Sequence, residues 1–189
     1  MTGGYSEMLD RALILAARAH RDQVRKGSDV PYVQHPVHVA ILLLKHGLDE
    51  PVVIAGLLHD VVEDTSVTLD EVRAEFGERV ADLVGAVSEK KEDSTGHRPW
   101  RVRKEEQLAM LAQAPLDVVA LKTADALNNG MTTLRDVRAR GEEAWSRFNA
   151  PKSDQLWIYR AVADVVRARL GDHALVRELD ECVTALEHT

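Results

Sequence analysis

Apolar residues recur at helical spacing along almost the whole chain, and no alternating run is long enough to predict a strand. Leu9, Leu13, Ala16 and Ala17 fall on one face of a first helix. The segment from Glu50 to Val62 is apolar nearly all round, which is typical of a central helix. The pattern therefore predicts an all-α fold of about ten helices. The remaining helices are expected over residues 36–47, 68–76, 78–87, 101–113, 115–129, 133–140, 142–148, 153–170 and 175–186.

Turn residues and polarity mark the loops between these helices. Glycine and proline break the segment RKGSDVPYVQHP, which precedes the second helix. Thr68 and Glu71 form a capping-box pattern, which predicts a helix start. The most polar stretch covers residues 88–99 and is expected to be a long loop, of a kind that is often functional or mobile. The sequence leaves open whether this loop closes over a ligand.

Length and composition narrow the class of protein. The 189 residues are enough for one domain, so a single domain over 1–189 is expected. Cys182 is the only cysteine, which excludes an intramolecular disulfide and a cysteine-based zinc site. The net charge of −7 argues against nucleic-acid binding. No apolar run approaches membrane-spanning length and the start lacks a secretory signal, so a cytoplasmic protein without membrane contact is expected.

A burst of polar residues ends the central apolar helix in the run LLHDVVED. His59 and Asp60 are adjacent, and Glu63 and Asp64 follow one helical turn later. Ionisable side chains directly after a buried run are costly unless something compensates their charge. A divalent cation would do so, and imidazole with carboxylate is a ligand set of zinc, manganese or iron. The alternative is an exposed helix end with solvated acids.

Two further residues extend this cluster. His35 lies in the PYVQHP loop, and Asp125 directly follows the apolar run VVALK. Either residue alone is a weak signal, since a lone histidine before a helix often caps or packs. His20 and His38 lie on helix faces, as core residues or as support for such a site. The order His35, His59-Asp60, Asp125 is what makes the set specific.

This ordered set resembles the HD superfamily of metal-dependent phosphohydrolases. The stretches RKGSDVPYVQHPVHVA and AGLLHDVVEDTSVTLDEVRAEFG are similar to the hydrolase domain of the RelA/SpoT alarmone enzymes, and most similar to small single-domain alarmone hydrolases. The resemblance runs from about Ala16 to Val166. It implies an HD-domain helical bundle of about ten helices, in agreement with the periodicity.

The resemblance also implies a role for individual residues. Glu63 and Asp64 match the catalytic acidic pair that positions and deprotonates the attacking water. The usual ion of the family is Mn²⁺, although another divalent metal stays open. The implied metal ligands are His35, His59, Asp60 and Asp125. The implied substrate contacts are Arg25, Lys26, Tyr32, Asn129 and Thr132, with Lys152 and Tyr159 added from the segment WSRFNAPKSDQLWIYR.

The sequence departs from the family in the motif D-[KR]-L-x-N-[LM]-R-[TS]. Ala126, Gly130 and Met131 stand where the family has a basic residue, a leucine or methionine, and an arginine. Two positive charges are therefore missing, and Lys122, Arg135 and Lys152 are the nearby basic residues that could replace them. The aromatic residues around Lys152, Tyr159 among them, are alternatively packing residues of the last helices. The basic cluster Arg98, Arg101, Arg103 and Lys104 is either a solvated helix start or a lid over an anion.

The expected function is Mn²⁺-dependent hydrolysis of ppGpp or pppGpp at the 3′ position, which yields GDP or GTP and pyrophosphate. The missing charges keep two alternatives open. One is an HD phosphohydrolase for another nucleotide, of the nucleotidase or NADPH 2′-phosphatase type. The other is a module that binds a nucleotide without hydrolysing it. The partner expected in each case is a small nucleotide, and the sequence leaves the oligomeric state open, a homodimer included.

Overall fold

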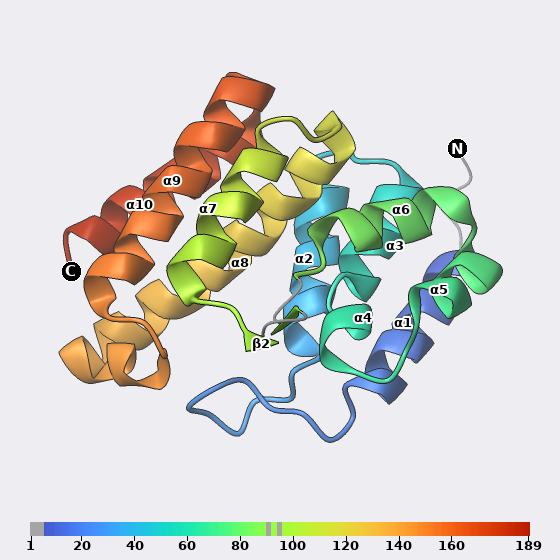
Figure 1. Cartoon of the computed structure of the whole chain (residues 1–189), viewed down its shortest axis with the longest axis horizontal. Helices are drawn as coiled ribbons and strands as arrows, with labels where there is room; N and C mark the ends of the chain where they lie inside the picture. Colours follow the sequence, from blue (N-terminus) through green and yellow to red (C-terminus); the bar gives the residue numbers. More distant parts are fainter. Residues whose placement is uncertain (1–5, 90–91, 94–95) are drawn as a thin grey trace. The chain divides into compact units, whose positions relative to one another are not determined.

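The computed structural model describes residues 6–89, 92–93 and 96–189. The chain divides into two compact units, Met1–Ser88 and Glu89–Thr189, which are described in turn. In the described part of the chain, ten α-helices and one short 3₁₀ helix carry nearly all the regular structure (Figure 1). The all-α expectation is confirmed. None of the described helices has the length and the apolar character needed to cross a membrane.

The first unit is organised around α3, the segment expected to be central. Every residue of α3 from Val52 to Leu58 is buried, and α1, α2 and α6 all pack on it. The capping box is present: the Glu71 amide donates to the Thr68 hydroxyl and the Thr68 amide donates to the Glu71 carboxylate. The helices are α1 (Glu7–Ala19), α2 (Gln34–Lys45), α3 (Glu50–Leu58), α4 (Val61–Asp64), α5 (Leu69–Phe76) and α6 (Glu78–Val87).

The largest boundary difference from the prediction in this unit is at the end of the central helix. The central helix ends at Leu58 rather than Val62, and the chain turns at His59 and Asp60 before the single turn of α4. The His59 ring contacts the Gly56 carbonyl (2.8 Å from Nδ1). This side-chain contact lies at the point where the regular backbone conformation of α3 ends. The turn thus falls at the polar residues that the sequence singled out.

The second unit is built on α8, which packs against both α9 and α10. Two helices were predicted over 115–129 and 133–140, and this was wrong, because α8 is continuous over 25 residues. The predicted helix over 142–148 is a 3₁₀ turn, η1. Part of the polar 88–99 segment forms the antiparallel pair β1–β2, whose strands are too short for alternation to reveal them; residues 90–91 and 94–95 lie outside the described part. The elements are β1 (Glu92–Asp93), β2 (Gly96–His97), α7 (Trp100–Leu111), α8 (Leu116–Arg140), η1 (Gly141–Arg147), α9 (Lys152–Leu170) and α10 (Ala174–Glu187).

Gly130 lies inside α8, at the point where the sequence predicted a gap between two helices. A β-carbon on Gly130 would lie 3.0 Å from the Cys182 sulfur of α10 and 3.7 Å from the Tyr159 ring of α9. The glycine therefore allows three helices to approach closely. Its place inside the helix is a packing requirement of the second unit.

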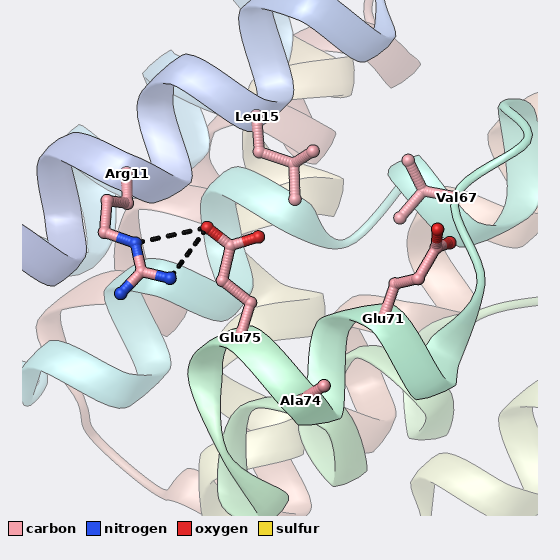
Figure 2. Close-up of a pocket in the computed structure, with 6 residues that line it drawn as sticks. All are labelled: Arg11, Leu15, Val67, Glu71, Ala74 and Glu75. Carbon is pink, nitrogen blue, oxygen red and sulfur yellow. Dashed lines mark hydrogen bonds and ion pairs between the residues drawn. The ribbon is translucent and has the colours of Figure 1, made fainter.

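A shallow groove lies between α1 and α5 in the first unit (Figure 2). Its volume is about 570 Å³, and the Arg11 guanidinium, 3.0 Å from a Glu75 carboxylate oxygen, lies on its wall. None of the predicted site residues lines this groove, so it is separate from the candidate site. Its lining residues are Arg11, Leu15, Val67, Glu71, Ala74 and Glu75.

Candidate metal centre

The segment before α2 is a short hairpin that carries the predicted basic residues. The Tyr32 amide donates to the Gln23 carbonyl and the Arg25 amide donates to the Val30 carbonyl, both at 2.9 Å. Gly27 has a positive φ of 73°, which a glycine adopts without strain, and it allows the tight tip. Arg25 and the exposed Lys26 therefore lie on a hairpin held at its base by backbone hydrogen bonds.

Three predicted ligands converge within the first unit. The Nε2 atoms of His35 and His59 are 3.2 Å apart. One Asp60 carboxylate oxygen, Oδ2, lies 3.4 Å from His35 Nε2 and 3.2 Å from His59 Nε2. Both imidazoles are almost fully buried. Three candidate metal-ligand atoms, from the start of α2 and the end of α3, thus face one another.

The protonation of His59 fits a metal ligand. Its Nδ1 lies 2.8 Å from the Gly56 carbonyl, which can only accept, so Nδ1 carries the proton. In the neutral ring Nε2 then has the lone pair, and it is Nε2 that faces His35 and Asp60. Two imidazole nitrogens and a carboxylate oxygen at this spacing suit a divalent cation of the zinc or manganese type. The residues present therefore fit the group that the HD pattern implies.

Tyr32 contacts a predicted ligand directly. Its hydroxyl donates to Asp60 Oδ2 at 2.7 Å, and the Arg25 guanidinium lies 5.5 Å from the ring centre. Burial raises the pKa of Tyr32 well above its usual value, and the negative charge of Asp60 raises it further. The phenol therefore stays protonated and serves as a donor to the Asp60 carboxylate. The sequence indicated a nucleoside contact for Tyr32 and gave no sign of this bond.

The predicted acidic pair lies on the single turn α4, directly after Asp60. Glu63 and Asp64 are both half-buried. The end of this turn is held by the Gln23 side-chain amide, which donates to the Asp64 backbone carbonyl at 2.8 Å. The Thr65 hydroxyl also donates to the Val61 carbonyl at 2.6 Å. Gln23 was missed by sequence reasoning, because its partner lies 41 residues away and no local pattern marks it.

His38 lies one turn after His35 on α2. Burial lowers the pKa of His38 from its usual value, and the neighbouring His35 lowers it further. The ring is therefore neutral near pH 7. Its role as a core residue or as support for the site stays a prediction.

Asp125 lies in the middle of α8, in the second unit. Its carboxylate oxygens accept from the Lys122 ammonium at 2.7 Å and from the Asn129 side-chain amide at 2.6 Å. Asn129 therefore faces the same side of α8 as Asp125, as its spacing of one turn predicts. The place of Asp125 among the metal ligands stays a prediction.

The other predicted substrate contacts also belong to the second unit. Tyr159 is buried, and its hydroxyl shares a hydrogen bond of 3.1 Å with Thr133. Burial raises the pKa of Tyr159 to about 12. The Lys152 ammonium lies 2.6 Å from a Glu142 carboxylate oxygen, and Thr132 is buried in α8. These contacts agree with the packing alternative for Tyr159, and the substrate roles of all three residues stay predictions.

The basic cluster at the start of α7 is paired with acids. Arg103 and Lys104 both bind the Glu89 carboxylate, whose side chain is 8% exposed, and the Lys104 contact is 2.5 Å. Arg101 binds Glu105 at 2.9 Å and also lies over the Trp157 ring, 3.2 Å from its centre. Burial lowers the pKa of Lys104, and the charge of Lys122 lowers it further. This cluster is thus a partly buried ion-pair network rather than a fully solvated helix start.

Two buried imidazoles beside a carboxylate, carried on α-helices, are typical of helical domains that bind a divalent metal. The chain belongs to the HD domain family, whose pattern matches residues 12–163.

Several proteins of this kind are similar to the chain. It is 34% identical over 178 residues to a GTP pyrophosphokinase of Streptomyces coelicolor, which covers 94% of the chain and 20% of that protein. It is 35% identical over 176 residues to the bifunctional (p)ppGpp synthase/hydrolase SpoT of Escherichia coli, covering 92% of the chain and 23% of that protein. The chain thus spans about a fifth of the length of the curated relatives it matches.

Solved structures resemble the chain over most of its length. A metazoan ortholog of SpoT, described as hydrolysing ppGpp, superimposes with a TM-score of 0.77 and 30% identity, and covers 97% of each chain. The protein lmo0812 of Listeria monocytogenes superimposes with a TM-score of 0.74 and 32% identity, and covers 84% of this chain and 97% of its own.

Proposed function

We propose that the chain is a Mn²⁺-dependent guanosine-3′,5′-bis(diphosphate) 3′-pyrophosphohydrolase. The observation that carries the proposal is the convergence of His35, His59 and Asp60 directly before the intact acidic pair Glu63 and Asp64. A module that only binds a nucleotide would have no use for that pair. The names of several relatives support the same activity, since one in Aquifex aeolicus, 37% identical over 131 residues, is a guanosine-3′,5′-bis(diphosphate) 3′-pyrophosphohydrolase.

The metal would be held by His35, His59 and Asp60, with Asp125 as the fourth ligand. Asp125 enters on the family pattern, in which an aspartate of the later helix completes the set. A bound divalent cation supplies Lewis acidity and lowers the pKa of water toward neutrality. Mn²⁺ is the ion we propose, on the usual preference of the family.

The chain's own residues would carry the rest of the reaction. Glu63 and Asp64 hold the attacking water close to the reacting phosphorus and take its proton. The water oxygen forms a bond to phosphorus, the bond from phosphorus to the 3′ oxygen breaks, and the acidic pair returns the proton to the 3′ oxygen, which leaves as a hydroxyl. Arg25 and Lys26 on the hairpin bind phosphate oxygens on which negative charge develops. ppGpp then gives GDP and pyrophosphate, and pppGpp gives GTP and pyrophosphate.

A second candidate substrate class is favoured by the motif departures on α8. Ala126 and Met131 lack the charges of the family motif, so an enzyme of this chemistry could act on a nucleotide with fewer phosphates, of the nucleotidase or NADPH 2′-phosphatase type. In either case the partner is a small nucleotide and the compartment we propose is the cytoplasm.

Release of pyrophosphate from ppGpp by the purified chain tests this proposal, measured with Mn²⁺ and with the metal removed by a chelator. We expect turnover only with metal, loss of turnover in His59→Ala and Asp125→Ala, and no change in His188→Ala, an exposed histidine in the second unit. A panel with NADPH and nucleoside monophosphates separates the two substrate classes. Tight nucleotide binding without turnover on any substrate would overturn the enzymatic proposal.

A further inference from the structure

His20 ends α1 and lies beside the candidate site, although the reaction proposed above does not use it. Its side chain is almost fully buried, and its ring centre is 4.9 Å from that of Tyr32. Its Nδ1 lies 2.7 Å from the Gln23 side-chain oxygen. The other ring nitrogen, Nε2, is buried without a hydrogen-bond partner among the described residues. Among the described residues, the His20 ring therefore makes one polar contact, which is to the Gln23 side chain.

The direction of the hydrogen bonds follows from the acceptor at the far end. The Asp64 backbone carbonyl can only accept, so the Gln23 side-chain nitrogen, 2.8 Å away, is the donor. The Gln23 side-chain oxygen must then accept, and His20 Nδ1 donates to it. A relay with one orientation thus runs from His20 through Gln23 to Asp64.

The end of this relay is the segment that most needs support. α4 has four residues, and one helical turn is not stable by itself in water. The Asp64 carbonyl belongs to its last turn, where carbonyls lack partners within the helix. The Gln23 side chain satisfies this carbonyl from a separate segment of the chain. It thereby fixes the turn that carries Glu63 and Asp64.

Gln23 also ties this turn to the basic hairpin. Its backbone carbonyl accepts from the Tyr32 amide at 2.9 Å, which closes the base of the hairpin. The Tyr32 hydroxyl in turn donates to Asp60. The metal ligand, the acidic pair and the phosphate-binding hairpin are thus joined through one glutamine.

We propose that His20 and Gln23 form a positioning pair, which holds the Glu63–Asp64 turn in register with the metal ligands and the basic hairpin. The inference rests on the proposed hydrolase function, because it concerns how the acidic pair is aimed at the water. Neither residue needs to touch the substrate. The pair should therefore affect turnover more than binding.

Two variants separate this role from simple packing. His20→Phe keeps a ring against Tyr32, so little packing is lost. It removes both ring nitrogens: Nδ1, which donates to Gln23, and Nε2, which has no hydrogen-bond partner among the described residues. Gln23→Glu keeps the length and an acceptor for His20 but cannot donate to the Asp64 carbonyl. Matched controls are His188→Phe and Gln113→Glu, at exposed positions of the second unit.

We expect kcat to fall about 10- to 100-fold in both variants, as for other residues that orient metal-site groups, with KM and Mn²⁺ affinity within about twofold. The melting temperature of His20→Phe should stay within about 2 °C. Amide exchange of residues 61–67, measured by mass spectrometry, should be faster in both variants and unchanged in the controls.

The outcomes distinguish this inference from the proposed function. An active wild-type protein whose variants keep kcat and amide protection overturns the positioning pair alone. A melting temperature lowered in both variants with kcat unchanged below it assigns the residues to folding and also overturns it. A wild-type protein that binds metal and hydrolyses no nucleotide overturns the proposed function, whatever the amide exchange shows.

Discussion

The packing at Gly130 leads to a quantitative prediction about the second unit. Gly130→Ala adds one β-carbon in the interior of α8, at a position where the family motif has leucine or methionine. That carbon would lie 3.0 Å from the Cys182 sulfur, closer than carbon and sulfur normally approach. The next contacts, 3.7 Å to the Tyr159 ring and 3.8 Å to Leu186, are ordinary. The steric conflict is therefore confined to one pair of atoms, which makes it testable.

Two opposing terms set the expected size of the effect. Alanine is favoured over glycine in a helix interior by about 0.8–1.0 kcal/mol. Overpacking a close contact costs about 1–3 kcal/mol. We therefore expect Gly130→Ala to lower the free energy of unfolding by about 0–2 kcal/mol. In a Cys182→Ala background the sulfur is gone, and the same change should raise it by about 1 kcal/mol.

A double-mutant cycle in urea measures this coupling. The free energies of unfolding of the wild type, the two single variants and the double variant give the coupling energy directly. We expect about 1–3 kcal/mol, with the double variant more stable than the sum of the single changes. Additivity within about 0.5 kcal/mol would refute the close contact. So would a Gly130→Ala variant that gains the full helix propensity without any change at Cys182.

Three other predictions concern single side chains. Tyr32→Phe removes the hydrogen bond to Asp60, so we expect Mn²⁺ affinity to fall about 10- to 100-fold in calorimetry; an unchanged affinity with a raised KM would instead make Tyr32 a substrate contact. Burial alone would raise the pKa of Glu89, but its bonds to Lys104 and the charge of Arg103 outweigh burial and lower it. The stability contributed by ionised Glu89 is therefore present above its ordinary pKa of 4.5 and lost as the pH falls below it. Glu89→Gln should lower the free energy of unfolding by about 2 kcal/mol at pH 7 and flatten its fall between about pH 5 and 3; an unchanged pH dependence would contradict this. Met131→Arg restores a charge of the family motif at an exposed position, so the KM for ppGpp should fall while the urea midpoint stays constant; an unchanged KM would show that the motif arginine has no role in this chain.

Local signals predicted the fold best. The capping box at Thr68 and Glu71 depends on residues three apart, and both of its hydrogen bonds are present. The buried face of α3 depends on a run of apolar residues, and α3 is the helix on which α1, α2 and α6 pack. In each case the residues that determine the feature lie within a few positions of one another in the sequence.

Features that depend on contacts with specific side chains were not predicted from the sequence. The break predicted between residues 129 and 133 was wrong: α8 continues through Gly130, whose close neighbour Cys182 lies more than fifty residues later. The end of α3 at Leu58, where the His59 ring contacts the Gly56 carbonyl, was missed. Both errors came from applying propensity where a specific contact decides.

The candidate site shows the same division. Residue types, their order and the HD resemblance predicted His35, His59, Asp60 and Asp125 as metal ligands; the structure brings His35, His59 and Asp60 together, and their role as ligands stays a prediction. The groups that orient them are ordinary residues: Tyr32 reaches Asp60 across 28 positions, and Gln23 reaches Asp64 across 41. No local pattern distinguishes Gln23 from other polar residues, and the motif around Tyr32 indicated a substrate contact rather than its bond to Asp60. Only the fold reveals which polar side chains support the site.

The three motif departures on α8 differ in how much room the structure leaves for the family residue. At Gly130 the close approach of Cys182 on α10 leaves little room for a leucine or methionine side chain. Ala126 is 7% exposed, and a basic residue in its place would have to bury its stem or its charge. Met131 is 43% exposed and could carry a charge without repacking. Of the three departures, the one at Met131 is therefore the one where a charge can be restored without repacking, and a substrate panel on Met131→Arg tests whether this position affects which phosphates the chain binds.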